Sequence, residues 1–195
     1  MKIGCVVMAA GRSTRFGKNK LLAPLAGKPL LSHVLDALPR QRFSRIVAVT
    51  SDDTVSDLCK AHGITAVQYG GGPQSETVRR GIGQMDGMDA CLFVQGDQPL
   101  CTPRSIIRLL DAFAQAPESV HRLSFHGTAG SPVLFPSCIF YAFCTLEGEQ
   151  GGMAAARAAG VGIRLVPADS AAELMDADTE KALSEIEKIY FEKSL

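Results

Sequence analysis

The stretch IGCVVMAAGRSTRFGKNKLL, residues 3–22, begins as an apolar run and ends as a basic loop. The run over residues 3–8 is almost continuously apolar, which is typical of a strand that is buried on both faces. Two glycines and four basic side chains follow within a dozen positions, and Gly11 allows the backbone to approach a ligand closely. Arginine can hold a phosphate through two parallel hydrogen bonds, and lysine supplies a mobile positive charge. The stretch therefore predicts a buried strand that leads into a phosphate-binding loop, with a solvated basic loop as the alternative.

Apolar runs and helical patterns alternate along the rest of the chain. The first half predicts strands over residues 45–50, 64–69 and 90–94 and helices over residues 29–38, 54–62, 75–85 and 103–116. The less regular second half predicts strands over residues 122–125, 132–135 and 161–166 and helices over residues 138–146, 151–159 and 179–191. Such alternation favours a three-layer α/β/α, Rossmann-like fold with a mostly parallel sheet covered on both faces. Ligands of such sheets bind at the carboxyl ends of the strands.

The composition limits the classes of protein to which this chain can belong. The 195 residues fit one domain, and a formal net charge of zero gives no general attraction for nucleic acid or an anionic membrane. We expect neither an export signal nor a membrane span, because no stretch approaches the roughly 20 apolar residues that a span requires. The six cysteines form no CxxC pair, and Cys5, Cys59 and Cys91 lie in apolar segments. These features predict a cytoplasmic protein with buried, reduced thiols.

The basic loop differs from two familiar phosphate-binding motifs. A Walker A loop has four residues between its first glycine and the Gly-Lys pair, and a serine or threonine follows. Here five residues separate Gly11 from Gly17, and Asn19 follows Lys18. The stretch does not match GxGxxG either, which argues against a dinucleotide-binding site.

Two acidic segments lie at the ends of predicted elements. Asp97 follows the fourth predicted strand, where Gly96 leaves space beside it, and Mg²⁺ prefers such carboxylate oxygen atoms. The alternative for Asp97 is a simple turn aspartate. Asp176 and Asp178 precede the C-terminal helix, which Asp178 or Thr179 could simply cap. From these residues alone, a metal-binding and a structural interpretation both stay open.

The loop resembles the nucleotidyltransferase signature LAAGxSxRMGxxKLL, with Phe16 in place of the usual methionine. The matching positions are Ala9, Ala10, Gly11, Ser13, Arg15, Gly17, Lys20, Leu21 and Leu22. Asp97 lies in a GDQP segment and Asp178 in a DxDT segment, in the order typical of the molybdenum-cofactor nucleotidyltransferases, the MobA-like NTP transferases. On these motifs the chain resembles that family from residue 3 to about residue 183, and most closely its molybdopterin cytidylyltransferase branch.

The resemblance implies a sheet of the nucleotide-diphospho-sugar transferase type in a single domain, residues 1–195. Residues 1–100 would form its nucleotide-binding half and residues 101–195 its acceptor-binding half. The implied catalytic residues are Arg15 at the departing phosphates, Lys20 at the reacting phosphates, and Asp97, which would hold Mg²⁺ together with Asp178. The other implied nucleotide contacts are Ala9, Ala10, Gly11, Ser13, Gly72, Thr77 and Gly96.

Two later segments fit the same family, and a third departs from it. Thr77 aligns with a serine that reads the base, although a place in the first helical turn behind a Ser75 cap is an equal alternative. Residues 130–135, GSPVLF, resemble a GxPVLF segment that shapes the acceptor side. The family often has an arginine in an LxGDxGxR segment, where this chain has Met153 or Ala154.

The implied reaction moves CMP from CTP to a phosphorylated acceptor, molybdopterin in this branch, and releases pyrophosphate. A phosphate oxyanion is already nucleophilic at neutral pH, so the protein must mainly position the reactants and neutralise their charge. A molybdenum hydroxylase apoenzyme is a candidate protein partner. One alternative keeps the fold but uses GTP, or a sugar or polyol phosphate as acceptor. Another is a non-catalytic maturation factor that binds nucleotide or cofactor for a molybdenum hydroxylase.

Overall fold

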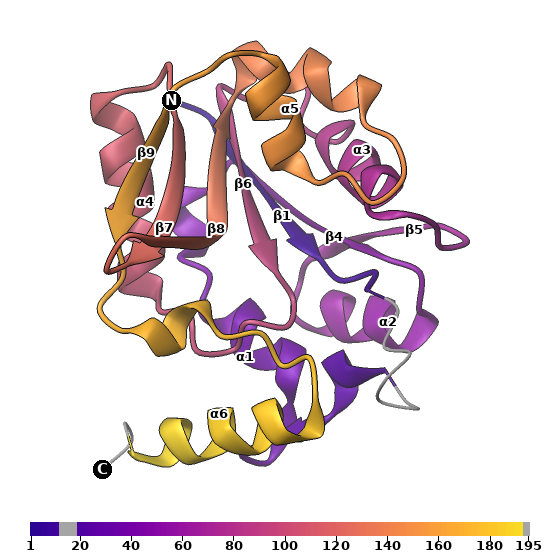
Figure 1. Ribbon diagram of the computed structural model, residues 1–195. Coiled ribbons are helices and arrows are strands. Elements are labelled where there is room, and N and C mark those ends of the chain that lie inside the picture. Colours follow the sequence, from indigo (N-terminus) through magenta and orange to yellow (C-terminus); the bar gives the residue numbers. More distant parts are fainter. Residues whose placement is uncertain (12–18, 193–195) are drawn as a thin grey trace.

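A seven-stranded, mostly parallel sheet runs through the molecule, and helices cover both of its faces (Figure 1). The computed structural model describes residues 1–11 and 19–192. In the sheet, β8 is antiparallel to both of its neighbours and the other adjacent strands are parallel. The strand order is β5 (Thr65–Gln68), β4 (Arg45–Thr50), β1 (Ile3–Met8), β6 (Ala90–Gln95), β8 (Thr128–Pro136), β7 (Val120–Phe125) and β9 (Ile163–Pro167).

The central strand β1 is buried on both faces, as its apolar run predicts. Cys5 and Val7 pack on one side of the sheet and Val6 packs on the other, and none of the three is exposed. Met8, the last residue of β1, pairs with Gln95, the last residue of β6. Because the two strands are parallel, the start of the basic loop and the segment that contains Asp97 leave the same edge of the sheet.

The helices form two layers around separate parts of the core. On one face, the apolar side chains of α1 (Leu30–Asp36), α2 (Asp53–Ala61), α4 (Pro103–Gln115) and α6 (Glu180–Glu192) pack into one cluster. On the other face, α3 (Gln74–Ile82), the 3₁₀ helix η3 (Ser137–Thr145) and α5 (Gly152–Ala158) pack into a second cluster. The three-layer prediction is therefore confirmed. The other 3₁₀ segments are η1 (Lys20–Leu22), η2 (Arg40–Arg42) and η4 (Ala171–Leu174).

Most predicted elements are present, and a few differ from the prediction in type or bounds. The strands over residues 3–8 and 45–50 have the predicted bounds, and the other predicted strands occur with shifted ends. The helix predicted over residues 138–146 is a 3₁₀ helix, and the helix predicted over residues 75–85 ends at Ile82. Ser75 lies inside α3 and Pro73 is its N-cap residue, so the predicted Ser75 cap is wrong. The short hairpin of β2 (Pro24–Leu25) and β3 (Lys28–Pro29) was not predicted.

All six cysteines are free, as predicted. Cys5, Cys59, Cys91 and also Cys101 are buried, whereas Cys138 and Cys144 are exposed. Burial raises the pKa of the Cys59 thiol to about 11, which makes it a poor nucleophile. No helix within the described residues is both long enough and apolar enough to cross a membrane.

Candidate functional site

Lys20 lies between the two carboxylates that the sequence assigns to a metal. Its Nζ atom is 2.5 Å from Oδ2 of Asp97 and 2.7 Å from Oδ1 of Asp178. The side chains of Lys20 and Asp97 are 12% and 17% exposed, whereas that of Asp178 is 60% exposed. Two carboxylates from distant parts of the chain thus converge on one positive charge at the carboxyl edge of the sheet.

A cap at the end of the basic loop fixes the position of Lys20. The side chain of Asn19 accepts a hydrogen bond from the backbone N–H of Leu21 at 3.1 Å, which begins the short helix η1. The same side chain donates to Asp52, the N-cap residue of α2, at 3.0 Å. Asn19 therefore anchors this end of the loop to the helix that follows β4, and Lys20 projects from the anchored end.

Three tethers bring the Asp178 segment to the Asp97 segment. The backbone N–H of Ala177 donates to the carbonyl oxygen of Asp97 at 2.9 Å. The side chain of Gln98 donates to the carbonyl oxygen of Leu174 at 3.3 Å. The third tether is the buried carboxylate of Glu173, which lies in η4. Because these tethers flank both aspartates, the pairing of Asp97 and Asp178 with Lys20 is held by the backbone as well as by charge.

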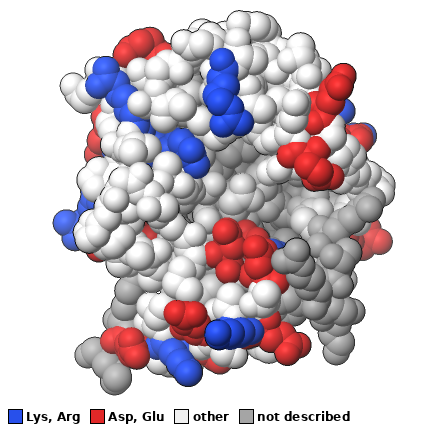
Figure 2. All heavy atoms as spheres, in the orientation of Figure 1, with Lys and Arg blue, Asp and Glu red and all other residues white. Residues whose placement is uncertain are grey.

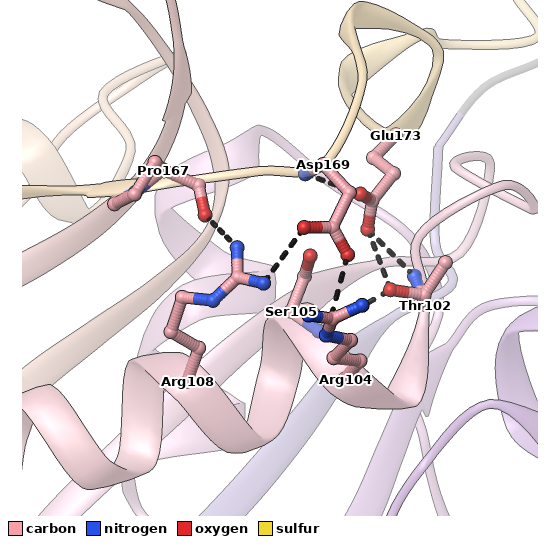
Figure 3. Close-up of polar contacts among 7 residues, drawn as sticks. All are labelled: Thr102, Arg104, Ser105, Arg108, Pro167, Asp169 and Glu173. Carbon is pink, nitrogen blue, oxygen red and sulfur yellow. Dashed lines mark hydrogen bonds and ion pairs between the residues drawn. The ribbon is translucent and has the colours of Figure 1, made fainter.

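Glu173 is 1% exposed and has three hydrogen-bond donors around it (Figure 3). Its Oε2 atom accepts from the backbone N–H of Thr102 at 3.0 Å and from the Thr102 hydroxyl at 2.8 Å. Its Oε1 atom accepts from the backbone N–H of Asp169 at 2.9 Å. Asp169 in turn pairs with Arg108 of α4 at 2.7 Å. The segment before Asp178 is therefore fixed to the first turns of α4.

The close spacing of the charged side chains shifts the pKa values of Lys20 and Asp176. Withdrawal of Lys20 from solvent would by itself lower its pKa, but the charges and hydrogen bonds of Asp97 and Asp178 outweigh that effect, so its pKa is raised. The pKa of Asp176 is raised to about 6, first by partial withdrawal from solvent and then by the negative charges of Asp97 and Asp178. Within the described residues, no group of three His, Cys, Asp or Glu side chains is arranged to hold a metal. A metal bound by Asp97 and Asp178 would therefore need further ligands, such as substrate phosphates or water.

A cavity of about 550 Å³ lies beside this cluster, between the end of β1 and the start of α3. Ala10, Gly11, Gly72 and Thr77, four predicted nucleotide contacts, line it. The hydroxyl groups of Thr77 and Tyr69 are 2.5 Å apart, so Thr77 already has one hydrogen-bond partner. The cavity is large enough for a nucleotide base and sugar. Within the described residues, the lining consists of Met8, Ala10, Gly11, Gly72, Pro73, Gln74, Thr77, Gln95 and Glu149.

A second cavity of about 430 Å³ extends from the acidic cluster toward β7 and β8. Asp97, Asp176 and Asp178 line one part of it, and Arg122 and Ser131 line another. Gln74 and Gln95 line both cavities, which are therefore adjacent. Figure 2 shows a hollow on this face, with acidic side chains on its lower side and basic side chains above it.

The predicted residues that the structure describes fall into three groups. Ala10, Gly11, Gly72 and Thr77 line the first cavity, and Lys20, Asp97 and Asp178 form the charged cluster. Ser13 and Arg15 lie outside the described residues. Ala9 and Gly96 are buried beneath the site and do not line the two cavities.

Gly96 supports the site through close packing. Its N–H donates to the Met8 carbonyl oxygen at 3.0 Å, and a Cβ atom at this position would lie 2.9 Å from the same oxygen. Only glycine permits this approach between the end of β6 and the end of β1.

Sequence reasoning missed several residues that line or support the site. Gln74, Gln95 and Glu149 line the cavities, and Glu173 fixes the acidic segment. Glutamine has no distinctive spacing pattern, and a glutamate in a polar stretch predicts exposure. Gln95 is the one with a usable signal, because it directly precedes the Gly-Asp pair at the carboxyl end of a predicted strand. The hydroxyl of Thr179 accepts a hydrogen bond from the N–H of Ala182 at 3.1 Å and so caps α6. The side chain of Asp178 instead accepts a hydrogen bond from Lys20.

Comparison with known proteins gives a family and a fold. The model of the MobA-like NTP transferase domain family matches residues 5–163. A 3-deoxy-manno-octulosonate cytidylyltransferase from Marinobacter nauticus is 32% identical over 124 residues, 61% of this chain and 47% of that protein. A 2-C-methyl-D-erythritol 4-phosphate cytidylyltransferase from Dehalococcoides mccartyi is 31% identical over 119 residues, 57% of this chain and 52% of that protein. The chain spans about half the length of these curated relatives.

Solved structures of low sequence identity share the fold over nearly the whole chain. A homologue of Rv0371c from Mycobacterium sp. strain JC1 superposes with a TM-score of 0.83 at 21% identity, covering 98% of each chain. Rv0371c of Mycobacterium tuberculosis in complex with manganese superposes with a TM-score of 0.78 at 21% sequence identity, covering 96% of this chain and 99% of that chain. A CMP:2-keto-3-deoxy-manno-octonic acid synthetase complexed with CTP superposes with a TM-score of 0.81 at 16% sequence identity, covering 99% of this chain and 100% of that chain. The predicted nucleotide-sugar transferase type of fold is therefore confirmed.

Proposed function

Because this chain belongs to the family of MobA-like NTP transferase domains, we propose that it is a Mg²⁺-dependent nucleotidyltransferase. It moves CMP from CTP to a phosphorylated acceptor and releases pyrophosphate. The observation that carries the proposal is the convergence of Asp97 and Asp178 on Lys20. Both aspartates line the second cavity, which shares Gln74 and Gln95 with the first. Two curated relatives are cytidylyltransferases and one structural relative was solved with CTP, which supports CTP as the donor.

The residues of this chain position the reactants and neutralise charge. The first cavity holds the nucleoside, with the backbone at Ala10 and Gly11 close to the phosphates. Lys20 stays charged at neutral pH because its pKa is raised, and it contacts the phosphate at which substitution occurs. Arg15 holds the departing pyrophosphate. A terminal phosphate of the acceptor, bound in the second cavity, attacks the α-phosphate in line.

The described residues fit a divalent cation. Asp97 and Asp178 converge on a single positive group, the Lys20 ammonium, so they are also placed to share one metal ion. Mg²⁺ is commonly bound by one or two carboxylates together with substrate phosphates. When bound, it would neutralise charge on the phosphates. One structural relative was solved with manganese, which supports a divalent metal in this fold.

For the acceptor we propose molybdopterin, on the basis of the loop signature and the GDQP segment that resemble the molybdopterin cytidylyltransferase branch. A molybdenum hydroxylase apoenzyme would then receive the product, and the cytoplasm would be the site of the reaction. A second candidate is a cytidylyltransferase with a sugar-acid or polyol-phosphate acceptor. It is favoured by the names of the curated relatives, which act on 3-deoxy-manno-octulosonate and 2-C-methyl-D-erythritol 4-phosphate.

Pyrophosphate release tests these assignments. The protein is incubated with Mg²⁺, each of the four NTPs in turn, and molybdopterin, 3-deoxy-manno-octulosonate or 2-C-methyl-D-erythritol 4-phosphate. We expect release with CTP and molybdopterin. Release with GTP alone would overturn the choice of base, and release only with another acceptor would overturn molybdopterin. Tight binding of CTP without release under any condition would favour the non-catalytic maturation factor.

Substitution of Asp97 tests the metal site. Asp97→Asn keeps the shape of the side chain but removes the charge, so turnover should fall by at least about 100-fold, since metal stabilisation of phosphate charge contributes several kcal/mol. The matched control is Asp111→Asn, because Asp111 forms a surface ion pair with Arg42 far from this chemistry. An Asp97→Asn variant with the activity of the control would remove Asp97 from the site.

A further inference from the structure

A third cavity of about 190 Å³ opens beside the acceptor cavity. Phe93, Val133 and Phe135 supply apolar walls from the sheet. Arg122 of β7 and Arg157 of α5 supply the charged part of the lining. Arg122 also lines the acceptor cavity, so the third cavity is a side chamber of the space in which we place the acceptor.

The two arginines face the chamber, and no Asp or Glu stands among its described lining residues. The Nε–H of Arg122 donates to the carbonyl oxygen of Gly130 at 3.3 Å. Within the described residues, neither Arg122 nor Arg157 forms an ion pair. By contrast, several surface arginines each pair with a carboxylate, namely Arg42, Arg80, Arg104, Arg108 and Arg164.

The positive charges of Arg122 and Arg157 act on each other. The pKa of Arg122 is lowered, first by its partial burial and then by the charge of Arg157. Two guanidinium groups that repel each other beside an apolar wall destabilise the ligand-free protein slightly. An anion between them would remove this repulsion and accept hydrogen bonds from the planar N–H groups of both.

We propose that Arg122 and Arg157 bind an anionic group of the acceptor that is distinct from the group that attacks the nucleotide: the dithiolate if the acceptor is molybdopterin, or the carboxylate if it is a sugar acid. This inference rests on the proposed nucleotidyl transfer. One part of the acceptor cavity carries Asp97 and Asp178, and another carries Arg122. This separation of charge orients an acceptor with two anionic groups: one lies at the reacting centre, and the other is held in the side chamber. Figure 2 shows the same separation of acidic and basic side chains across the hollow.

The position of Arg157 also accounts for the altered segment of the sequence. Met153 or Ala154 stands where the resembled family often has an arginine, yet Met153, Ala154 and Arg157 all line the same chamber. Residues three or four apart share one face of a helix. Arg157 therefore restores a positive charge to this wall one turn later on α5.

Side-chain NMR tests the site without assuming turnover. Inorganic phosphate and acetate are titrated separately into ¹⁵N-labelled protein, and the arginine Nε–H signals are followed. Arg122→Lys and Arg157→Lys assign the two signals by their loss. We expect the signals of Arg122 and Arg157 to shift with one or both anions, while that of Arg80, already paired with Glu76, stays in place. A shift with acetate shows that the site accepts a carboxylate, and a shift with phosphate alone shows that it requires a more highly charged anion.

Truncation of Arg157 provides the decisive comparison. Arg157 is exposed, so Arg157→Ala should fold normally. It should weaken anion binding at Arg122 by about tenfold or more, because one charge-assisted hydrogen bond contributes at least that factor. In turnover, the KM for the acceptor should rise while the KM for CTP and kcat stay unchanged, and Arg80→Ala should change none of these.

The outcomes separate the two proposals. If neither anion moves the Arg122 signal, or if Arg157→Ala leaves the anion affinity unchanged, the chamber is not an anion site, whatever the activity with CTP. If anions bind as expected but no nucleotide is turned over, the proposed function fails and the anion site remains.

Discussion

Replacing the buried Glu173 with glutamine should destabilise the protein by about 2 kcal/mol. Glutamine keeps the size of the side chain but exchanges one acceptor oxygen for an NH₂ group. In the native protein one carboxylate oxygen accepts from Asp169 and the other accepts twice from Thr102. The single amide oxygen can serve only one of these sides, so at least one N–H group that points at this buried side chain faces another donor. An unsatisfied buried donor costs about 1–3 kcal/mol.

Urea unfolding followed by far-UV circular dichroism measures this loss, since the chain contains no tryptophan. For a chain of this size, a loss of about 2 kcal/mol corresponds to a decrease in Tm of about 4–8 °C. The control is Glu118→Gln, an exposed glutamate beside Ser119 and Arg164, which should change the free energy of unfolding by less than about 0.5 kcal/mol. If Glu173→Gln is no less stable than this control, Glu173 does not hold the acidic segment.

Two further predictions concern stability. The pKa values of His33 and His121 are lowered, in each case first by burial, so below about pH 6.5 the unfolded chain binds more protons than the native protein and stability falls. The carboxyl of Asp176, whose pKa is raised to about 6, has the opposite effect on stability, so the test uses an Asp176→Asn background. In this background, acidification from pH 7.5 to 6.0 should lower the free energy of unfolding by up to about 1.5 kcal/mol. Urea titrations that show no decrease would contradict this prediction. Gly96→Ala should destabilise by about 1–3 kcal/mol, because the new Cβ lies 2.9 Å from a main-chain carbonyl oxygen at the end of β1. Gly11→Ala, whose Cβ would meet no atom of the described residues within 4 Å, should leave the urea midpoint unchanged but weaken CTP binding measured by calorimetry. Equal urea midpoints for the Gly96→Ala and Gly11→Ala variants would refute the packing argument.

Local sequence patterns determined much of the fold, because burial and helical periodicity are properties of short segments. The apolar runs of β1 and β4 located both strands with their observed bounds. Thr102 directly precedes Pro103 at the start of a helical pattern, as is typical of an N-cap residue, and its hydroxyl accepts from the N–H of Ser105 at 3.2 Å. The 3₁₀ geometry of η3 was missed, since apolar spacing does not distinguish a 3₁₀ helix from an α-helix over a few residues.

The sequence by itself determined which residues are candidates for the chemistry, because the loop signature and the two acidic segments are recognised from residue identity and spacing alone. Only the tertiary structure decided that Lys20 lies between Asp97 and Asp178, which are 77 and 158 positions away. That contact depends on the pairing of β1 with β6 and on the return of the chain past Glu173, neither of which has a local pattern. The same holds for Arg122 and Arg157, which belong to no sequence motif. They line one chamber because the fold places β7 and α5 beside the acceptor cavity.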